Sequence, residues 1–409
     1  DDYAFCLVGG PTYGSLHRNR EARVAVGPLA GFKIIELAGV GPAPICAMLL
    51  ADLGASVLRI ERTVPAKLGV ERPVKYNLIL RNREMIALDL KKSESVELVL
   101  DLVSNADGLV EGFRPGVMER LGLGPDICSA RNAKLVYGRV TGWGQSGPLA
   151  HTAGHDLNYI AVTGVLAAMG RNGQLPTPSL NLVGDFAAGG LYLALGVLAA
   201  LLEAQRSGKG QTIDCSIMDG AASMMMQFFG MKAAGLWSDQ RGANVLDSGA
   251  PFYDAYPCAD GRLISIAPIE DKFFAELLVR LDLPSSCLAM KQDRAKWPEL
   301  RDILADTIAT RSLAEWVDVL DGSDSCFAPV LMMEEAQHHP QIAARGTLVS
   351  VDGVVQPRPM PAFSRTVPDT PRPPRGVDPQ QHDAILRRWL PADMAERHGA
   401  AAAIHCHSP

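Results

Sequence analysis

The sequence predicts an α/β fold, with a large Rossmann-like domain followed by a small α/β domain. Three observations predict it. Short β-rich runs alternate with helical segments over about 110 residues. A hairpin pattern followed by further helices begins near Gly249. The chain of 409 residues is also long enough for more than one hydrophobic core. The order strand, helix, strand implies parallel strands joined by right-handed crossovers.

The large domain is expected to begin with a β-α-β unit. Residues 32–37 are β-rich, the turn Gly39-Val40-Gly41-Pro42 follows, and 43–53 and 56–60 have the pattern of a helix and a strand. The turn has two glycines of a dinucleotide-binding loop but lacks the third, so it is a weak indication of a nicotinamide cofactor. Further along we expect strands at 85–90, 108–111, 135–141 and 211–218, and helices at 93–105, 117–121, 185–206 and 221–236.

The small domain is predicted from a β-hairpin and three helices. The strands are expected at 251–257 and 262–267, and the helices at 271–281, 297–310 and 313–319. Beyond Arg345 the chain is polar and rich in proline, which is typical of an extended segment, and one last helix is expected at 379–390. We therefore expect a disordered leader at 1–26, the large domain at 27–220, a helical linker at 221–248, the small domain at 249–345, a segment returning to the large domain at 346–392 and a disordered tail at 393–409.

Composition favours small-molecule chemistry. The net charge is −6 and no strong basic patch stands out, which argues against a nucleic-acid surface. The eight cysteines are scattered without zinc spacing, so we expect free thiols, a reducing compartment and no metal site. No targeting signal is legible, and the cytoplasm is the expected location. The apolar stretch 187–203 contains three glycines and is followed by charges, which favours a buried helix over a membrane span.

Seven short segments, spread between Gly27 and Arg365, form a specific combination. They read VLRIER at 57–62, EGFRPG at 111–116, GHDLNY at 154–159, NLVGDF at 181–186, GKGQ at 208–211, GAPFY at 249–253 and IE at 269–270. Together they resemble the class III CoA-transferase superfamily (CaiB/BaiF-like), and within it the α-methylacyl-CoA racemases. The resemblance implies an acyl-CoA substrate, no other cofactor and an interlocked homodimer. In such a dimer the large domain of one subunit meets the small domain of the other at the active site.

The resemblance also implies which residues perform the chemistry. Inversion of a carbon needs two acid/base groups, one on each face. Without the resemblance, the sequence indicates that His155 is an exposed loop residue and that Asp185 is the N-cap residue of a helix. The resemblance instead implies that these two residues are the opposed catalytic pair. It further implies that Glu270 assists the histidine from the small domain. We expect Asp156 to hold the thioester oxygen through its backbone N–H or its side chain.

The CoA moiety is expected along the same segments. Arg62 and Arg114, which alone would pass for solvated surface charges, match phosphate-binding arginines of the superfamily. Glu84 departs from the superfamily, which usually has a basic residue there, so we expect an altered hold on CoA. The resemblance places Leu88, Asp89, Leu90 and Lys91 along the adenine and phosphates, and Gly154, Asn158 and Tyr159 along the pantetheine.

The sequence therefore favours a racemase that inverts C2 of 2-methyl-branched acyl-CoA esters through an enolate. The alternative is a CoA transferase that works through an aspartyl-CoA thioester at Asp185, although the transferases generally lack a histidine at the position of His155. A non-catalytic CoA-binding protein is the third possibility.

Overall fold

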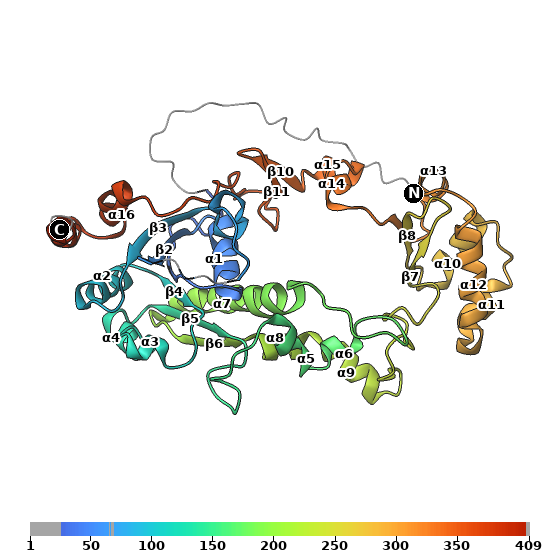
Figure 1. Ribbon diagram of the computed structural model, residues 1–409, viewed down its shortest axis with the longest axis horizontal. Coiled ribbons are helices and arrows are strands. Elements are labelled where there is room, and N and C mark those ends of the chain that lie inside the picture. The colour runs from blue at the N-terminus through green and yellow to red at the C-terminus, as the bar shows by residue number, and fades with distance from the viewer. Residues whose placement is uncertain (1–25, 65, 67–68, 406–409) are drawn as a thin grey trace.

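A six-stranded, fully parallel sheet lies at the centre of the first part of the chain (Figure 1). The structure is a computed structural model that describes residues 26–405, except 65 and 67–68. The predicted leader at 1–26 lies, apart from Val26, outside the described residues. The strand order is β3-β2-β1-β4-β5-β6, which confirms the predicted Rossmann-like sheet. The strands are β1 (Lys33–Leu37), β2 (Ser56–Arg62), β3 (Arg83–Leu88), β4 (Gly108–Glu111), β5 (Val136–Thr141) and β6 (Thr212–Ser216).

Helices cover both faces of this sheet, which explains why its strands are apolar almost throughout. Successive residues of a strand point to opposite faces. Thus Ile35 of β1 packs with α2 and α16 on one side, and Ile34 packs with α1 and α7 on the other. The helices of this part are α1 (Pro42–Asp52), α2 (Ser93–Ser104), α3 (Val117–Arg120), α4 (Pro125–Arg131), α5 (Asp156–Ala161), α6 (Val165–Ala168) and α7 (Tyr192–Ser207).

The helix predicted at 185–206 has two parts in the structure. A π-helix, η3 (Leu182–Leu191), continues directly into α7. Within the described residues this stretch, Leu182–Ser207, is the one helix long and apolar enough to cross a membrane by length and composition alone. Of its most apolar window 44% is buried, and Leu193 and Val197 lie in the core against the sheet. The face of this helix that contacts the sheet is buried in the core, as predicted.

Two predicted boundaries shift where the chain leaves the sheet. The strand expected at 211–218 ends at Ser216, whose hydroxyl accepts the backbone N–H of Asp219 (2.9 Å) and so caps the next helix. The single helix expected at 221–236 is two helices that meet at Met225. They are α8 (Ile217–Met224) and α9 (Met226–Ala233).

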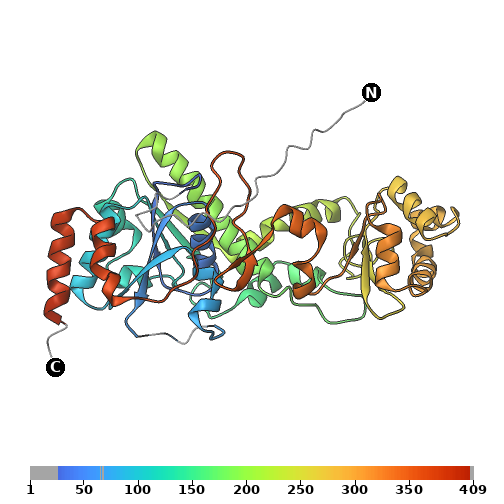
Figure 2. The same ribbon diagram turned by 90° about the horizontal axis from the view of Figure 1, so that it is seen from above.

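A second unit with its own core lies at the far end of the molecule from the parallel sheet (Figures 1 and 2). Its sheet has three antiparallel strands, which confirms the predicted hairpin. The core is rich in aromatic residues, including Phe252, Phe274 and Trp316. The elements are β7 (Asp254–Pro257), β8 (Leu263–Ile266), β9 (Phe327–Pro329), α10 (Asp271–Arg280), α11 (Cys287–Gln292), α12 (Trp297–Ile308) and α13 (Leu313–Leu320).

The chain then returns to the first sheet, as predicted. Short helices and a hairpin lead back, and Arg81 fastens the hairpin by donating to Oε1 of Gln356 (2.9 Å) and the carbonyl of Pro357 (2.7 Å). The returning elements are α14 (Met333–Ala336), α15 (Pro340–Arg345), β10 (Leu348–Val351), β11 (Val354–Pro357), α16 (His382–Trp389) and α17 (Ala392–His405). Short 3-10 turns are η1 (Val74–Tyr76), η2 (Leu78–Leu80), η4 (Arg294–Lys296) and η5 (Pro379–Gln381).

The prediction of a disordered tail from residue 393 is wrong for the described part of the chain. Helix α17 packs beside α16, and Ala395 is buried in the same core as α2. Nε2 of His398 lies 2.8 Å from Oδ2 of Asp101, a buried carboxylate that also binds Arg131. A buried carboxylate needs such partners, and the contact between His398 and Asp101 holds α17 against the rest of the fold.

Candidate active site

Three of the four residues predicted to be catalytic, His155, Asp156 and Asp185, gather at the carboxyl edge of the parallel sheet. Strand β1 pairs with β2 on one side and β4 on the other, so the direction of winding reverses between β1 and β4. In doubly wound sheets, ligands bind in the crevice outside the carboxyl ends of the strands at this point. The loops that follow β1, β4 and β5 border it.

Asp185 lies against the loop between β1 and α1. Gly41 in this loop has a φ of 79°, and a Cβ there would lie 3.5 Å from Oδ1 of Asp185. The positive φ favours glycine at this position, and the distance shows that the carboxylate of Asp185 lies directly against the turn. Asp185 stands in the first turn of η3, and the cap residue is Asn181, whose side-chain amide donates to Oδ2 of Asp185 (3.3 Å). The N-cap interpretation of Asp185 is therefore wrong, and π-helical turns occur frequently at functional sites.

Asp156 ties the beginning of α5 to the beginning of η3. Its Oδ2 accepts the backbone N–H of Asp185 (2.7 Å), and the residue is 6% exposed. A Cβ on Gly184 would lie 2.2 Å from the same oxygen, so only glycine permits this approach. Oδ1 of Asp156 is buried and has no hydrogen-bond partner within the described chain. The side chain of Asp156 thus fixes the backbone that carries Asp185.

His155 precedes α5 as its N-cap residue and is exposed. Its backbone N–H donates to Oδ1 of Asn158 (3.0 Å), which fixes the start of the helix. The imidazole lies close enough to Asp185 to lower the pKa of that carboxyl, opposing the effect of burial. The structure therefore brings His155, Asp156 and Asp185 into one site.

Burial shifts the acidity of both carboxyl groups in the same direction. It raises the pKa of Asp185, and the neighbouring charge of Asp156 adds to this, while Asn181 and His155 oppose it. Burial also raises the pKa of Asp156, against the backbone N–H groups of Asp185 and Gly184. A carboxyl group that must both take and give a proton near neutral pH benefits from a raised pKa.

Tyr159 packs against the backbone of Gly142 and Gly154, in the segment between β5 and α5. Its hydroxyl donates to the carbonyl of Gly154, and its ring packs edge-on against Trp143 with the centroids 4.8 Å apart. Burial raises the pKa of Tyr159, Asp185 acts in the same direction, and Arg114 opposes them. Tyr159 is therefore within electrostatic reach of both Asp185 and Arg114.

The predicted CoA-binding residues lie along the same edge. Arg62 ends β2 and is in register with Leu88, the last residue of β3. The guanidinium of Arg62 lies 5.8 Å from the ring centroid of Phe113, which immediately precedes Arg114 after β4. Next to Leu88 come Asp89, Leu90 and Lys91, of which Lys91 donates its backbone N–H to Oδ1 of Asp89 (3.1 Å).

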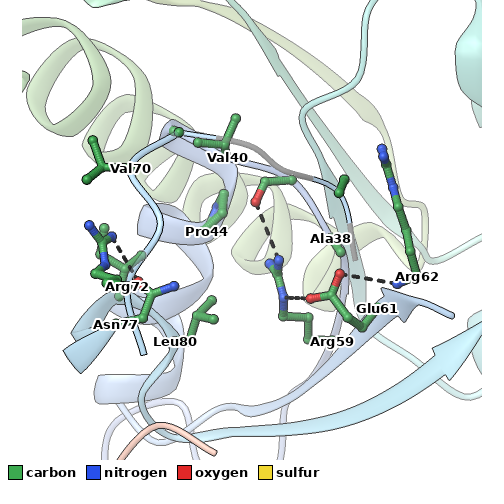
Figure 3. Close-up of a pocket in the computed structure, with 15 residues that line it drawn as sticks. Ala38, Val40, Pro44, Arg59, Glu61, Arg62, Val70, Arg72, Asn77 and Leu80 are labelled. Atoms are coloured by element: carbon green, nitrogen blue, oxygen red, sulfur yellow. Dashed lines mark hydrogen bonds and ion pairs between the residues drawn. The ribbon is translucent and has the colours of Figure 1, made fainter. Parts of the chain in front are cut away.

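A pocket of about 290 Å³ opens beside the ends of β1 and β2 (Figure 3). The turn Gly39-Val40-Gly41 forms one side of it, and Arg62 lines it. Residues 88–91 and Arg114 do not border this pocket, although they follow neighbouring strands. The pocket also includes residues of the stretch 69–80, which connects β2 to β3.

A buried ionic network beneath the pocket was not predicted. Glu36, which is fully buried in β1, binds the guanidinium of Arg59 and, at 2.9 Å, Nε of Arg83. Arg59 also pairs with Glu61 (3.0 Å) and donates to the carbonyl of Gly39 (3.4 Å). The sequence carries one signal for this network, because Glu36 interrupts an otherwise apolar buried strand.

Two further residues lie away from this edge. Glu270 is exposed at the N-cap of α10, in the second unit, and in Figure 1 that helix lies apart from α5, which is near the middle of the molecule. A single chain therefore does not bring Glu270 to His155. Glu84 accepts hydrogen bonds from Nε of Arg388 (2.9 Å) and Nε1 of Trp389 (2.7 Å), at the amino end of β3. The carboxylate of Glu84 therefore fastens α16, and its expected effect on the hold on CoA stays a prediction.

The described residues contain no group of three or more His, Cys, Asp or Glu side chains that would suit a metal ion. The doubly wound parallel sheet, with acid/base side chains at its switch point and two arginines along the same edge, defines an α/β protein of the Rossmann-like class.

Comparison with known proteins identifies the family. Residues 29–383 match the family described as CoA-transferase family III. The chain is 44% identical over 364 residues to the alpha-methylacyl-CoA racemase of Mus musculus, covering 88% of this chain and 93% of the mouse protein. It is 41% identical over 339 residues to the protein of the same name from Homo sapiens, covering 83% and 87%. A crystal structure of a CAIB/BAIF family protein from Brucella suis superimposes with a TM-score of 0.75 at 25% identity, over 89% of this chain and all of that one. The chain belongs to the CoA-transferase family III.

Proposed function

We propose that this chain is a racemase of 2-methyl-branched acyl-CoA thioesters, which inverts C2 by removing and returning a proton. The position of His155 carries the proposal: it directly precedes Asp156, whose side chain accepts the backbone N–H of Asp185 (2.7 Å), so two acid/base groups belong to one site. Two similar proteins bear the name alpha-methylacyl-CoA racemase, which supports the same reaction.

In this mechanism one of the two groups removes the proton on C2 while the other delivers a proton to the opposite face. The negative charge that develops on the thioester oxygen needs donors that are already in place. The backbone N–H of Asp156, at the first position of α5, is the proposed donor. The reaction as proposed draws on CoA only as part of the substrate and needs no metal or redox group.

We propose that the active unit is an interlocked homodimer, with residues 27–220 and 249–345 as its domains and 346–392 as the returning segment. The accessible surface of the chain is 23593 Å². A compact chain of 43.7 kDa exposes about 15,000 Å². The residues outside the described part add about 5,000 Å² even when fully extended, so a large excess remains. An extended chain of this kind favours a second copy that covers the excess.

An apolar stripe along one helix supports the same proposal. Leu191, Leu195 and Leu202 are each more than half exposed and follow each other at spacings of four and seven residues, on one face of η3 and α7. In the proposed dimer, Glu270 of one subunit approaches His155 of the other. This arrangement accounts for the distance between these two residues within one chain.

The test is deuterium uptake at C2 from heavy water, measured separately for each enantiomer of a 2-methylacyl-CoA. We expect the wild type to exchange and interconvert both. His155→Gln and Asp185→Asn should each lose racemisation by about 10²-fold or more. Each should keep exchange with one enantiomer only, and the two variants should keep opposite ones. His151→Gln, an exposed histidine four residues upstream, is the matched control and should behave as the wild type.

Absence of exchange on every branched acyl-CoA would overturn the proposal. The name of the family favours one alternative, the transfer of CoA between carboxylic acids through an aspartyl-CoA thioester at Asp185. A hydroxylamine-sensitive adduct on Asp185, formed only when a second acid is present, would establish that alternative in place of racemisation.

We propose the cytoplasm as the compartment. The six cysteines within the described residues are free, and four of them are buried, which suits a reducing environment. Imaging of the tagged full-length protein tests this, and co-localisation with a membrane-bounded organelle would contradict it.

A further inference from the structure

The pocket in Figure 3 contains more positive than negative charge. Three guanidinium groups line it, those of Arg59, Arg62 and Arg72, against the single carboxylate of Glu61. Gly41, which lies against Asp185, borders the same pocket. A ligand in this pocket therefore reaches the loop that contacts the catalytic carboxylate.

One of the three cations is fully compensated. Arg59 pairs with Glu36 and with Glu61, and Arg83 shares Glu36 from the other side. These two guanidinium groups and two carboxylates balance each other beneath the pocket. Arg59 thus serves the fold and has no charge to offer a ligand.

The other two cations have no carboxylate partner within the described part of the chain. Arg62 lies over the ring of Phe113, and Nη2 of Arg72 donates to the neutral side chain of Asn77 (3.0 Å). Both are exposed, and Figure 3 shows them on opposite sides of the pocket with Arg59 between them. Two uncompensated guanidinium groups facing one pocket favour an anion that lies between them.

We propose that Arg72 pairs with Arg62 to hold phosphate groups of the CoA moiety. The inference rests on the proposed function and adds to it a binding residue outside the seven segments that carry the resemblance. Arg72 belongs to the stretch 69–80, which brings its guanidinium to the pocket from the side opposite the sheet strands. A phosphate between two arginines receives paired hydrogen bonds from both.

The test is calorimetric titration of the full-length protein with CoA, 3′-dephospho-CoA and pantetheine. Arg72→Gln should weaken the binding of CoA about tenfold, as expected for the loss of one charge-assisted pair. It should leave the binding of pantetheine unchanged. Lys75→Gln is the matched control, because it removes the same charge from an exposed residue three positions away that does not line the pocket. Arg72→Lys should recover part of the affinity.

The ligand series identifies the phosphate. If Arg72→Gln weakens the binding of CoA but not of 3′-dephospho-CoA, Arg72 holds the 3′-phosphate. If it weakens the binding of both ligands, Arg72 holds the diphosphate. Equal affinities of Arg72→Gln and Lys75→Gln for CoA would overturn the inference, as would an equal loss with pantetheine. A wild type that binds CoA but takes up no deuterium would refute the racemase and leave this inference standing.

Discussion

At the scale of single residues, the site depends on charged side chains that are buried and paired with specific partners. Glu36 is the clearest example, because a fully buried carboxylate in a parallel strand is tolerated only with cationic partners on both sides. The network also reaches the loop between β1 and α1, since Arg59 donates to the carbonyl of Gly39. The ionic partners of Glu36 therefore support the turn against which Asp185 lies.

Arg59→Met is expected to lower the free energy of unfolding by about 3 kcal/mol, because it removes one partner of a buried carboxylate. Urea denaturation measures the change. Glu97→Gln is the control, because it breaks an ion pair with Arg131 in which both side chains are exposed. Such a pair contributes less than about 1 kcal/mol. Equal losses for the two variants would mean that the buried network does not stabilise this end of the sheet.

The raised pKa of Asp185 predicts a dependence of stability on pH. Folding favours the protonated form of a carboxyl group whose pKa is raised in the folded state. Its contribution is fully present below the pKa of the unfolded chain and is lost as the pH rises through the folded value. An asparagine at position 185 cannot ionise, so Asp185→Asn does not lose this stabilisation as the pH rises. The variant should therefore melt at a higher temperature than the wild type at neutral pH, and the two melting temperatures should converge in acid. Thermal melts across this range measure it, and a difference that grows in acid would contradict the prediction.

At the scale of elements, the parallel sheet was predictable and several helices were not. Strands such as 108–111 are short apolar runs between turns, a local pattern that the sequence shows directly. The π-helical turn that carries Asp185 has no such pattern, because apolar residues surround it on all sides. The docking of α17 depends on Asp101, nearly 300 residues earlier in the chain. No local pattern reveals a partner at that distance.

The same limit applies to the candidate site. The motif that contains His155 and the motif that contains Asp185 were recognisable, and the structure brings the two together. Arg72 was not recognisable, because a lone arginine in a loop has the pattern of any solvated charge. Its relation to Arg62 appears only when the stretch 69–80 folds back over the ends of β1 and β2.

Glu84→Lys is expected to release the C-terminal helices. It replaces a carboxylate that accepts from Arg388 and Trp389 with a cation facing Arg388. We expect a loss of about 2 kcal/mol in the docking of α16, seen as faster amide hydrogen exchange over 382–398. Glu84→Gln keeps an acceptor for Trp389 and should have a smaller effect. A changed affinity for CoA without faster exchange would contradict this prediction and would support the expectation that Glu84 alters the hold on CoA.

At the scale of the whole molecule, the chain separates groups that the proposed reaction needs together. His155 and Asp185 stand at the parallel sheet, and Glu270 stands in the second unit (Figure 1). The outgoing elements α8 and α9 and the returning elements α14 and α15 connect the two ends separately. A path that goes out and returns suits a second chain passing through it, with each subunit completing the site of the other.

Co-expression of two inactive variants tests this arrangement. We pair a His155→Gln chain with a Glu270→Gln chain under different tags and isolate the mixed dimer. If Glu270 acts in the site of the other subunit, one of the two sites receives both defects and the other receives neither. The mixed dimer should then recover about half of the racemisation rate of the wild type, whereas each variant alone remains impaired in racemisation. The matched control pairs His155→Gln with Asp185→Asn. Both positions belong to the same end of the same chain, so neither site of that mixed dimer is intact and no recovery is expected. Absence of recovery in the test pair would place Glu270 and His155 of one subunit in the same site and refute the shared site. Recovery in the control would contradict the placement of His155 and Asp185 in one subunit.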